Sequence, residues 1–456
     1  MNRLQGMNVS EFPAVQPGTV FEPENVAAVQ ELLKAHNASI NLPLRVVSSG
    51  YNWGLGSASS PTPNTDLVHL HRLNKIRIID LERGFAVVEA GVTQDQLSAE
   101  LQGTSRFLNC TASSGQTSIV GNMMDRGVGL HGQRTHDLLG VEVVLPDGTA
   151  GTVGWWPNVG SLAANRWGLG PSSLHLFTQS NFAVVTAATI SLRPRPSRRE
   201  IVTFTVDPGT METVVDQLRT LVGDGILSGV TKIYDEESSS LYGAREARIA
   251  IHACIDGPEQ IAEAKISELW RRLGSIQPQR VPASKVNDDP LMSAVISLYD
   301  GDTSNSETIV RNALNASTQG ADKHGTGWIF ALPFLPMHGR DVVKAIEIVR
   351  QSIVGTNVRA GTTVNVLDHD TVDLVVALSF QRDETGSNDA HQVFDRMVSK
   401  LVDSGYAPYR VDTGHTREDY ADQGRSIDAL LAQRISRVID PTRVFASNRY
   451  VTAGAE

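Results

Sequence analysis

The sequence of 456 residues contains only two cysteines, Cys110 and Cys254, which lie far apart. Two distant thiols cannot build a disulfide framework or a thiolate metal site, so we predict neither, and no metal site at all. No apolar run approaches the roughly 20 residues that span a bilayer. The first 17 residues lack the apolar core of a signal peptide. We therefore expect a cytoplasmic protein with no membrane partner.

Basic residues are too few for a nucleic-acid surface, because 40 Lys and Arg face 50 Asp and Glu and give a formal net charge of −10. Apolar residues make up 41% and charged residues 20%, as in a globular protein. The length allows two or three domains. We expect a small-molecule substrate and no nucleic acid as partner, and we leave a homodimer open.

Glycine, in contrast, is concentrated in residues 115–148, where it recurs at irregular intervals. Glycine lets the backbone approach a ligand closely. Successive backbone N–H groups in such loops suit a pyrophosphate. The stretch fits the inner wall of a flavin site, but it also fits a glycine-rich connection between two strands.

A second glycine-containing loop, Ser-Gly-Tyr-Asn-Trp-Gly at residues 49–54, follows a short strand predicted at residues 44–48. A strand followed by a tight glycine turn is a common way to present N–H groups to a phosphate. The loop lacks the spacing of a dinucleotide fingerprint, so its signal is weak when taken alone.

Beyond residue 200 the pattern changes to an alternation of strands and helices. Apolar spacing predicts helices at residues 211–222, 258–273 and 340–353, and strands at residues 248–254 and 372–380. This alternation predicts an α+β domain, in which helices cover one face of an antiparallel sheet.

Five stretches, in this order, resemble the flavin-binding oxidoreductases of the vanillyl-alcohol oxidase and p-cresol methylhydroxylase type. They are residues 22–30, residues 47–54, residues 118–129 with the run Asp-Arg-Gly-Val-Gly, residues 176–181, and residues 439–446. Several ordered motifs are far more specific than any one glycine loop.

The resemblance implies a two-domain, FAD-binding PCMH-type fold of α+β class. An FAD-binding domain would span residues 20–202, a cap domain residues 203–404, and residues 405–456 would return to the FAD domain. It also implies which residues hold the cofactor: Ser48, Ser49, Gly50, Tyr51, Asn52, Trp53, Gly54, Gly115, Ser118, Ile119, Gly121, Asn122, Gly127, Gly129 and Val185.

Tyr409 and Arg410 resemble the adjacent tyrosine and arginine with which this family binds a substrate phenolate. Arginine and tyrosine donors suit a developing oxyanion. The alternative is a surface arginine that follows a buried tyrosine. His131 and His136 are further catalytic candidates on the substrate side, although a lone histidine is more often a structural hydrogen-bonding group.

The sequence also departs from the family pattern. Leu55 stands where the family has a second tyrosine that holds the phenol. Ser113 stands where it has a catalytic aspartate, and Leu130 where it has a further aromatic residue. The simple phenol pocket is therefore only partly present, and a larger or less polar substrate is expected.

We expect FAD to bind non-covalently. Asn52 stands where related bicovalent enzymes carry a nearby histidine, and the oxidase's linking histidine falls near Asp373. His369 is out of register, and Cys110 is more simply a buried, unreactive thiol.

The resemblance implies an FAD-dependent oxidase or dehydrogenase that takes a hydride from a phenolic, benzylic or alcohol-bearing carbon. Electrons would pass to O2 or to another acceptor. One alternative is a flavin-dependent reductase of the same superfamily that uses NADPH. Another is a flavin-free binding protein whose site has decayed.

Overall fold

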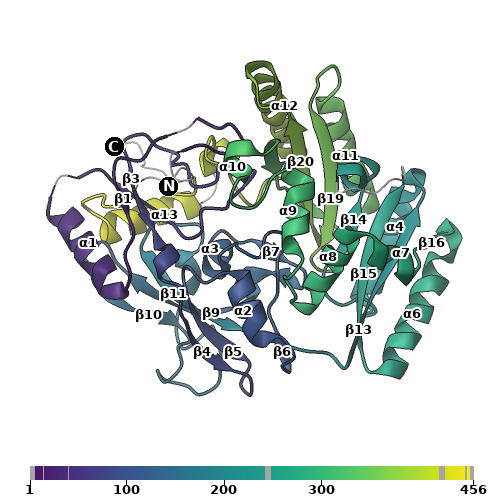
Figure 1. Ribbon diagram of the computed structural model, residues 1–456, viewed down its shortest axis with the longest axis horizontal. Coiled ribbons are helices and arrows are strands. Elements are labelled where there is room, and N and C mark those ends of the chain that lie inside the picture. The colour runs from purple at the N-terminus through teal and green to yellow at the C-terminus, as the bar shows by residue number, and fades with distance from the viewer. Residues whose placement is uncertain are drawn as a thin grey trace.

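The computed structural model describes residues 6–451 except 14, 40, 242–247, 421–426 and 447–448. It has two halves that lie side by side (Figure 1). The first half contains the purple and blue N-terminal elements with the yellow C-terminal helix, and the second contains the teal and green elements. None of the described helices is both long and apolar enough to cross a bilayer.

Two sheets form the first half. A parallel sheet has the order β1 (Val20–Phe21), β3 (Asp66–His69), β2 (Leu44–Val47). An antiparallel sheet has the order β10 (Ala150–Gly154), β9 (Leu138–Val144), β11 (Val184–Ser191), β5 (Phe85–Glu89), β4 (Ile76–Asp80). Short pairs join β6 (Arg106–Phe107) to β12 (Arg193–Pro194) and β7 (Val128–Gly129) to β8 (Gly132–Gln133). The helices are α1 (Val26–Ala38), α2 (Gln94–Leu101) and α3 (Ile119–Met124).

The C-terminal segment returns to this first half. After α13 (Ile427–Ile439), Phe445 forms a parallel bridge with Leu44 of β2. The Leu44 N–H donates to the carbonyl of Val444 at 2.8 Å, and the N–H of Ala446 donates to the carbonyl of Leu44 at 3.0 Å. The first half is therefore built from both ends of the sequence.

One eight-stranded antiparallel sheet dominates the second half. Its order is β16 (Gln279–Arg280), β13 (Arg198–Val206), β15 (Ile249–Gly257), β14 (Thr231–Tyr234), β19 (Arg359–Val366), β20 (Thr371–Phe380), β17 (Gly327–Ala331), with β18 (Phe334–Pro336) also paired to β20. The helices around it are α4 (Met211–Gly223), α5 (Glu236–Leu241), α6 (Glu259–Leu273), α11 (Gly339–Ser352) and α12 (Glu384–Asp403).

The two faces of this sheet differ because side chains alternate along each strand. On one face Ile233, Ile251, Val364 and Leu374 form a core with apolar side chains of α4, α6, α11 and α12. The other face looks towards the first half of the molecule and lines a cavity. The predicted α+β class, with an antiparallel sheet covered by helices, is confirmed.

Four short helices, α7 (Ala283–Asp288), α8 (Pro290–Ser297), α9 (Ser306–Leu314) and α10 (Ala321–His324), follow β16 in the sequence. Leu291 and Val295 of α8 and Ile309 of α9 pack into the core of the first half. The two halves therefore share packed side chains. The predicted domain boundaries at residues 202 and 404 stay a prediction.

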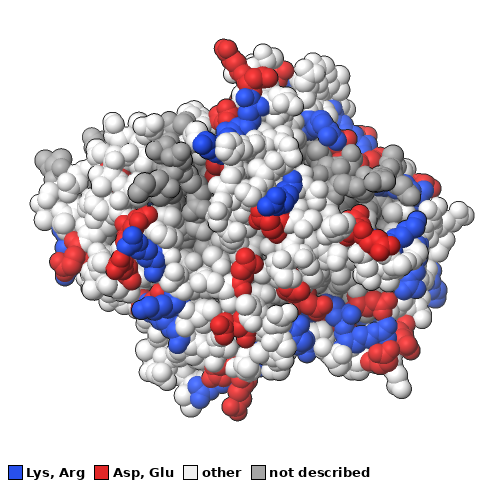
Figure 2. All heavy atoms as spheres, viewed as in Figure 1, with Lys and Arg blue, Asp and Glu red and all other residues white. Residues whose placement is uncertain are grey.

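On the face seen in Figure 2, acidic and basic side chains of the described residues are interspersed. Among the described residues, Arg198 pairs with Glu259 and Arg72 with Glu24. Exposed pairs of this kind add little to stability.

Candidate active site

Two cavities meet between the halves. The inner cavity is enclosed by the loop after β2, by α3 and by the C-terminal segment, and the outer cavity is roofed by the eight-stranded sheet. Both are lined by Tyr51, Asn52, Thr117, Asn122 and Arg410, so the two cavities adjoin each other at these residues.

The inner cavity depends on the close approach of two loops. The backbone N–H of Ser118 donates to Ser49 Oγ at 3.1 Å. A Cβ added to Gly121 would lie 2.0 Å from Ser48 Oγ and 3.3 Å from Ser48 Cβ, so Ser48 would have to shift to admit a side chain there. Gly50 has a φ of +73°, a conformation that favours glycine. The structure therefore favours glycine at positions 50 and 121, two of the cofactor residues predicted from the sequence.

The inner cavity fits an anionic cofactor such as FAD. Arg45 Nε and Asn122 Oδ1 are both buried, line the cavity, and have no hydrogen-bond partner among the described residues. Burial, and then the neighbouring charge of Arg449, lower the pKa of Arg45 to about 9. A buried cation without a direct partner needs an anion, and a pyrophosphate supplies one.

Asp125 connects the glycine loop to the C-terminal segment. Its Oδ1 accepts hydrogen bonds from Tyr450 OH at 2.7 Å and Arg449 Nη2 at 3.1 Å, and its Oδ2 accepts from Arg410. Burial alone would raise the pKa of Asp125, but Arg410 and Arg449 outweigh burial and lower it to about 2. The carboxylate is therefore ionised at neutral pH.

Tyr409 and Arg410 are brought together at the junction of the cavities. The Tyr409 ring stacks on Phe334, with 4.2 Å between ring centres and 4° between planes. Burial, and then the charge of Asp373, raise the pKa of Tyr409 well above its usual value, so it stays a neutral donor. Arg410 Nη2 also donates to Asn52 Oδ1 at 2.7 Å.

The predicted cofactor residues fall into three groups. Those that line the inner cavity are Ser48, Ser49, Gly50, Tyr51, Asn52, Ser118, Gly121, Asn122 and Val185. Trp53 and Gly129 line the outer cavity. Gly54, Gly115, Ile119 and Gly127 line neither.

Gly54 has a different steric role from the one expected. A Cβ there would lie 2.2 Å from Phe330 of β17, and the carbonyl of Gly54 accepts the Phe330 N–H at 2.9 Å. Gly54 thus allows the first loop to contact the second half of the molecule. Gly115 is similar, because a Cβ there would lie 1.6 Å from Asp95 Oδ1.

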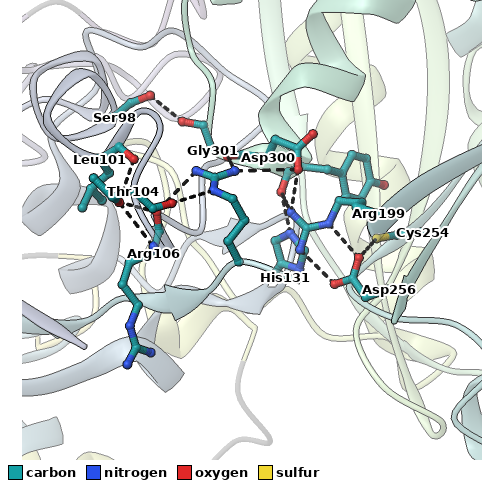
Figure 3. A network of polar contacts seen from close by, with 12 residues as sticks. Ser98, Leu101, Thr104, Arg106, His131, Arg199, Cys254, Asp256, Asp300 and Gly301 are labelled. Carbon is teal, nitrogen blue, oxygen red and sulfur yellow. Dashed lines mark hydrogen bonds and ion pairs between the residues drawn. The ribbon is translucent and has the colours of Figure 1, made fainter. Parts of the chain in front are cut away.

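The two candidate histidines lie away from the cavity walls. His131 is buried in a polar network at the joint between the halves, beside Arg199, Asp256 and Asp300 (Figure 3). Its Nε2 lies 2.8 Å from the carbonyl oxygen of Tyr299, and burial followed by Arg199 lowers its pKa to about 4. His136 is exposed. Neither histidine lines either cavity.

The nucleophiles considered for a covalent flavin link line neither cavity. Cys110 is fully buried and lines neither cavity, and burial raises the pKa of its thiol to about 12. His369 lies in the exposed turn between β19 and β20 and contacts Asp370 at 2.9 Å.

Sequence reasoning missed the basic residues of the inner cavity and most of the polar residues on the cap sheet. Arg45 and Arg449 line the inner cavity, whereas Lys232, His252 and Asn365 line the outer one. The only local signal for Asn365 is the alternation of polar and apolar residues at positions 363–366, which indicates a strand with one polar face.

Comparison with known proteins agrees with this geometry. Residues 17–154 match the family model described as FAD binding domain. The chain is 26% identical to 1'-carboxy-chondrochloren decarboxylase of Chondromyces crocatus, over 96% of this chain and 90% of that protein. It is 25% identical to the flavoprotein subunit of 4-cresol dehydrogenase [hydroxylating] of Pseudomonas putida, over 96% of this chain and 88% of that protein.

The fold matches p-cresol methylhydroxylase with substrate bound, with a TM-score of 0.87, 22% identity, and coverage of 98% of this chain and 91% of that chain. The resemblance seen in the sequence is thus confirmed. The chain has the PCMH-type fold and binds FAD, and it is similar to FAD-binding oxidoreductases.

Proposed function

We propose that this FAD-binding oxidoreductase takes a hydride from a phenolic, benzylic or alcohol-bearing carbon of a small molecule and passes the electrons to O2 or another acceptor. The observation that carries the proposal is the position of Tyr409 and Arg410 where the cofactor cavity adjoins the outer cavity. Bound FAD supplies the hydride acceptor.

Arg410 is suited to hold a substrate oxyanion. Its Nε and Nη2 are occupied by Asp125 and Asn52, which fixes the plane of the guanidinium. Its Nη1 makes no hydrogen bond with any described residue and is available to a ligand in the cavity. A donor that is already oriented stabilises developing negative charge without further reorganisation.

Tyr409 supplies a second, neutral donor at the same place. Its stacking on Phe334 fixes the ring, and burial keeps the hydroxyl protonated. A phenol or alcohol held by both residues becomes a better hydride donor, because negative charge on oxygen pushes electrons towards the breaking C–H bond. The name of the 4-cresol dehydrogenase relative supports a phenolic substrate.

The remaining wall of the outer cavity includes a large apolar part, formed by Leu130, Leu291, Met292, Val295 and Ile309. Leu130 stands where the family has an aromatic residue. Side chains of this kind accept an aromatic ring or an alkyl chain. The proposal is therefore a substrate with an apolar body and one oxygen near Arg410.

The deciding experiment is anaerobic stopped-flow reduction of the bound flavin by a panel of phenols, benzylic alcohols and secondary alcohols, with NADPH as a separate arm. Bleaching by at least one phenol or alcohol supports the proposal. Bleaching by NADPH alone would establish the reductase alternative instead. A protein that cannot bind FAD would favour the flavin-free alternative, which the unpaired Arg45 in the inner cavity speaks against.

A further inference from the structure

A row of polar residues crosses the cavity face of the eight-stranded sheet. His252, Lys232, Asn365 and Asp373 come from β15, β14, β19 and β20, and each is the direct cross-strand partner of the next. All four are buried and all four line the outer cavity. None of the four has a role in the proposed hydride transfer.

Lys232 is the cation of this row. Its side-chain Nζ donates to Asn365 Oδ1 at 2.6 Å and lies 5.4 Å from the centre of the Tyr234 ring. Asn365 in turn donates to Asp373 Oδ2 at 3.1 Å. Lys232 itself is 7% exposed, and no carboxylate of a described residue makes an ion pair with it.

Neither of the two carboxylates in the cavity wall makes a hydrogen bond or ion pair with Lys232, although Asp373 Oδ1 is buried and has no hydrogen-bond partner among the described residues. Asp289 Oδ1 accepts the N–H groups of Leu291 and Met292 at 2.9 and 3.0 Å and so caps α8. Asp373 is separated from Lys232 by Asn365. Burial raises the pKa of Asp373 to about 6, so its carboxylate is still mostly ionised at pH 7 and acts on Lys232 only through space, without an ion pair.

The ammonium group nevertheless keeps its proton at neutral pH. Burial lowers the pKa of Lys232 to about 8, opposed by the charge of Asp373. His252 adds no charge there, because burial and then Lys232 lower its pKa to about 4. Lys232 is therefore a cation in a largely dry wall without a direct counter-charge, and such a group favours an anionic ligand.

We propose that Lys232 anchors a carboxylate of the substrate, so that the substrate is an acid with an oxidisable oxygen-bearing carbon. The inference rests on the proposed function in that it takes the outer cavity as the substrate cavity. The carboxylate would lie against the cap sheet, and the oxygen to be oxidised would lie towards Arg410. Asn365 holds the ammonium group in place from the side.

The test compares two ligands that differ only in the acid group, 3-(4-hydroxyphenyl)propionate and 4-propylphenol. Their dissociation constants are measured by isothermal titration calorimetry on the FAD-loaded protein. The wild type is expected to bind the acid more tightly, on the order of 10- to 100-fold, as one charge-assisted contact allows. Lys232→Met should abolish this preference and leave the affinity for 4-propylphenol within about threefold.

Lys344→Met is the matched control, because Lys344 is exposed on α11 of the same half, and it should keep the preference for the acid. If Lys232→Met does not fold, Lys232→Gln replaces it, and the same loss of preference for the acid is expected. Equal affinity of the wild type for both ligands, or a preference retained in Lys232→Met, overturns the anchor. If the acid binds through Lys232 but no phenol or alcohol reduces the flavin, the proposed oxidation fails while the anchor stands.

Discussion

Arg410 donates two hydrogen bonds to a single oxygen of Asp125, from Nε at 3.1 Å and from Nη2 at 2.5 Å, across a separation of 285 residues. This pair joins the glycine loop of the first half to the segment that returns from the cap. Because Arg449 and Tyr450 bind the other oxygen, both oxygens of Asp125 are saturated. The guanidinium is therefore oriented before any substrate arrives.

Arg410→Ala should slow flavin reduction by substrate on the order of a hundredfold, which corresponds to about 3 kcal/mol of lost transition-state stabilisation. Arg410→Lys should slow flavin reduction nearly as much, because an ammonium group cannot make both hydrogen bonds to Asp125 and also reach the substrate. Anaerobic stopped-flow bleaching measures the rate, and the ratio of flavin to protein absorbance checks that FAD stays bound. Arg340→Ala, at an exposed position on α11, is the control. A wild-type rate in Arg410→Ala would place the substrate anchor elsewhere.

Asp125→Asn should destabilise the protein at pH 7 by about 3 kcal/mol, because it leaves Arg410 and Arg449 without their buried counter-charge. The pKa of Asp125 is lowered to about 2 in the folded protein, against about 3.9 when unfolded. Its ionised form therefore stabilises the fold above about pH 4, and this contribution is lost as the pH falls towards 2.

Urea unfolding of both proteins at pH 7, 4 and 3 measures this effect. The difference between wild type and Asp125→Asn should shrink as the pH falls. Asp403→Asn, at an exposed position at the end of α12, should match the wild type throughout. A difference that stays constant with pH would show that the charge of Asp125 is not its source.

Gly121→Val and Gly54→Val should fail in different ways. At Gly121 the new side chain collides with Ser48 Oγ and separates the loops that enclose the cofactor, so FAD should be lost. At Gly54 it collides with Phe330, and its φ of +79° is strained for a β-branched residue. Gly54→Val should therefore lower the melting temperature while FAD remains bound. Full flavin content in Gly121→Val would show that the inner cavity has been assigned to the wrong ligand.

Acid precipitation should release the flavin into the supernatant, because we expect FAD to bind non-covalently. The candidate nucleophiles Cys110 and His369 lie outside both cavities, and Cys110 has a raised pKa. Absorbance of the supernatant and pellet near the flavin bands measures the partition. Colour retained in the pellet would contradict the expectation, and His252, which lines the outer cavity, would then be the first residue to substitute.

Helices α4, α6 and α11 of the second half could be predicted from the sequence, because the apolar residues of each recur at helical spacing on one face. The ranges 211–222, 258–273 and 340–353 agree closely with α4, α6 and α11. The apolar run at residues 328–335 predicts one strand, but the structure has two, β17 and β18. Pro333 lies between them, and proline has no N–H for a strand ladder.

Strand β14 is not predicted by its composition, and β19 is indicated only by the short polar–apolar alternation at residues 363–366. Each carries polar residues on its cavity face, such as Lys232 on β14 and Thr363 and Asn365 on β19, which breaks the apolar run expected of a buried strand. The polar residues of the site were missed for the same reason. Arg45 and Arg449 come together only after the C-terminal segment has returned, and no local pattern records that contact.

The cross-strand row of polar residues also has a consequence for folding. A slip of β14 by one residue would turn Lys232 into the helix-covered core and Ile233 into the cavity, since neighbouring side chains point to opposite faces. An ammonium group buried among apolar helices without partners is strongly disfavoured. The same residues that give the cavity its charge therefore penalise misaligned strand pairing, so the register of the sheet and the chemistry of its binding face are selected together.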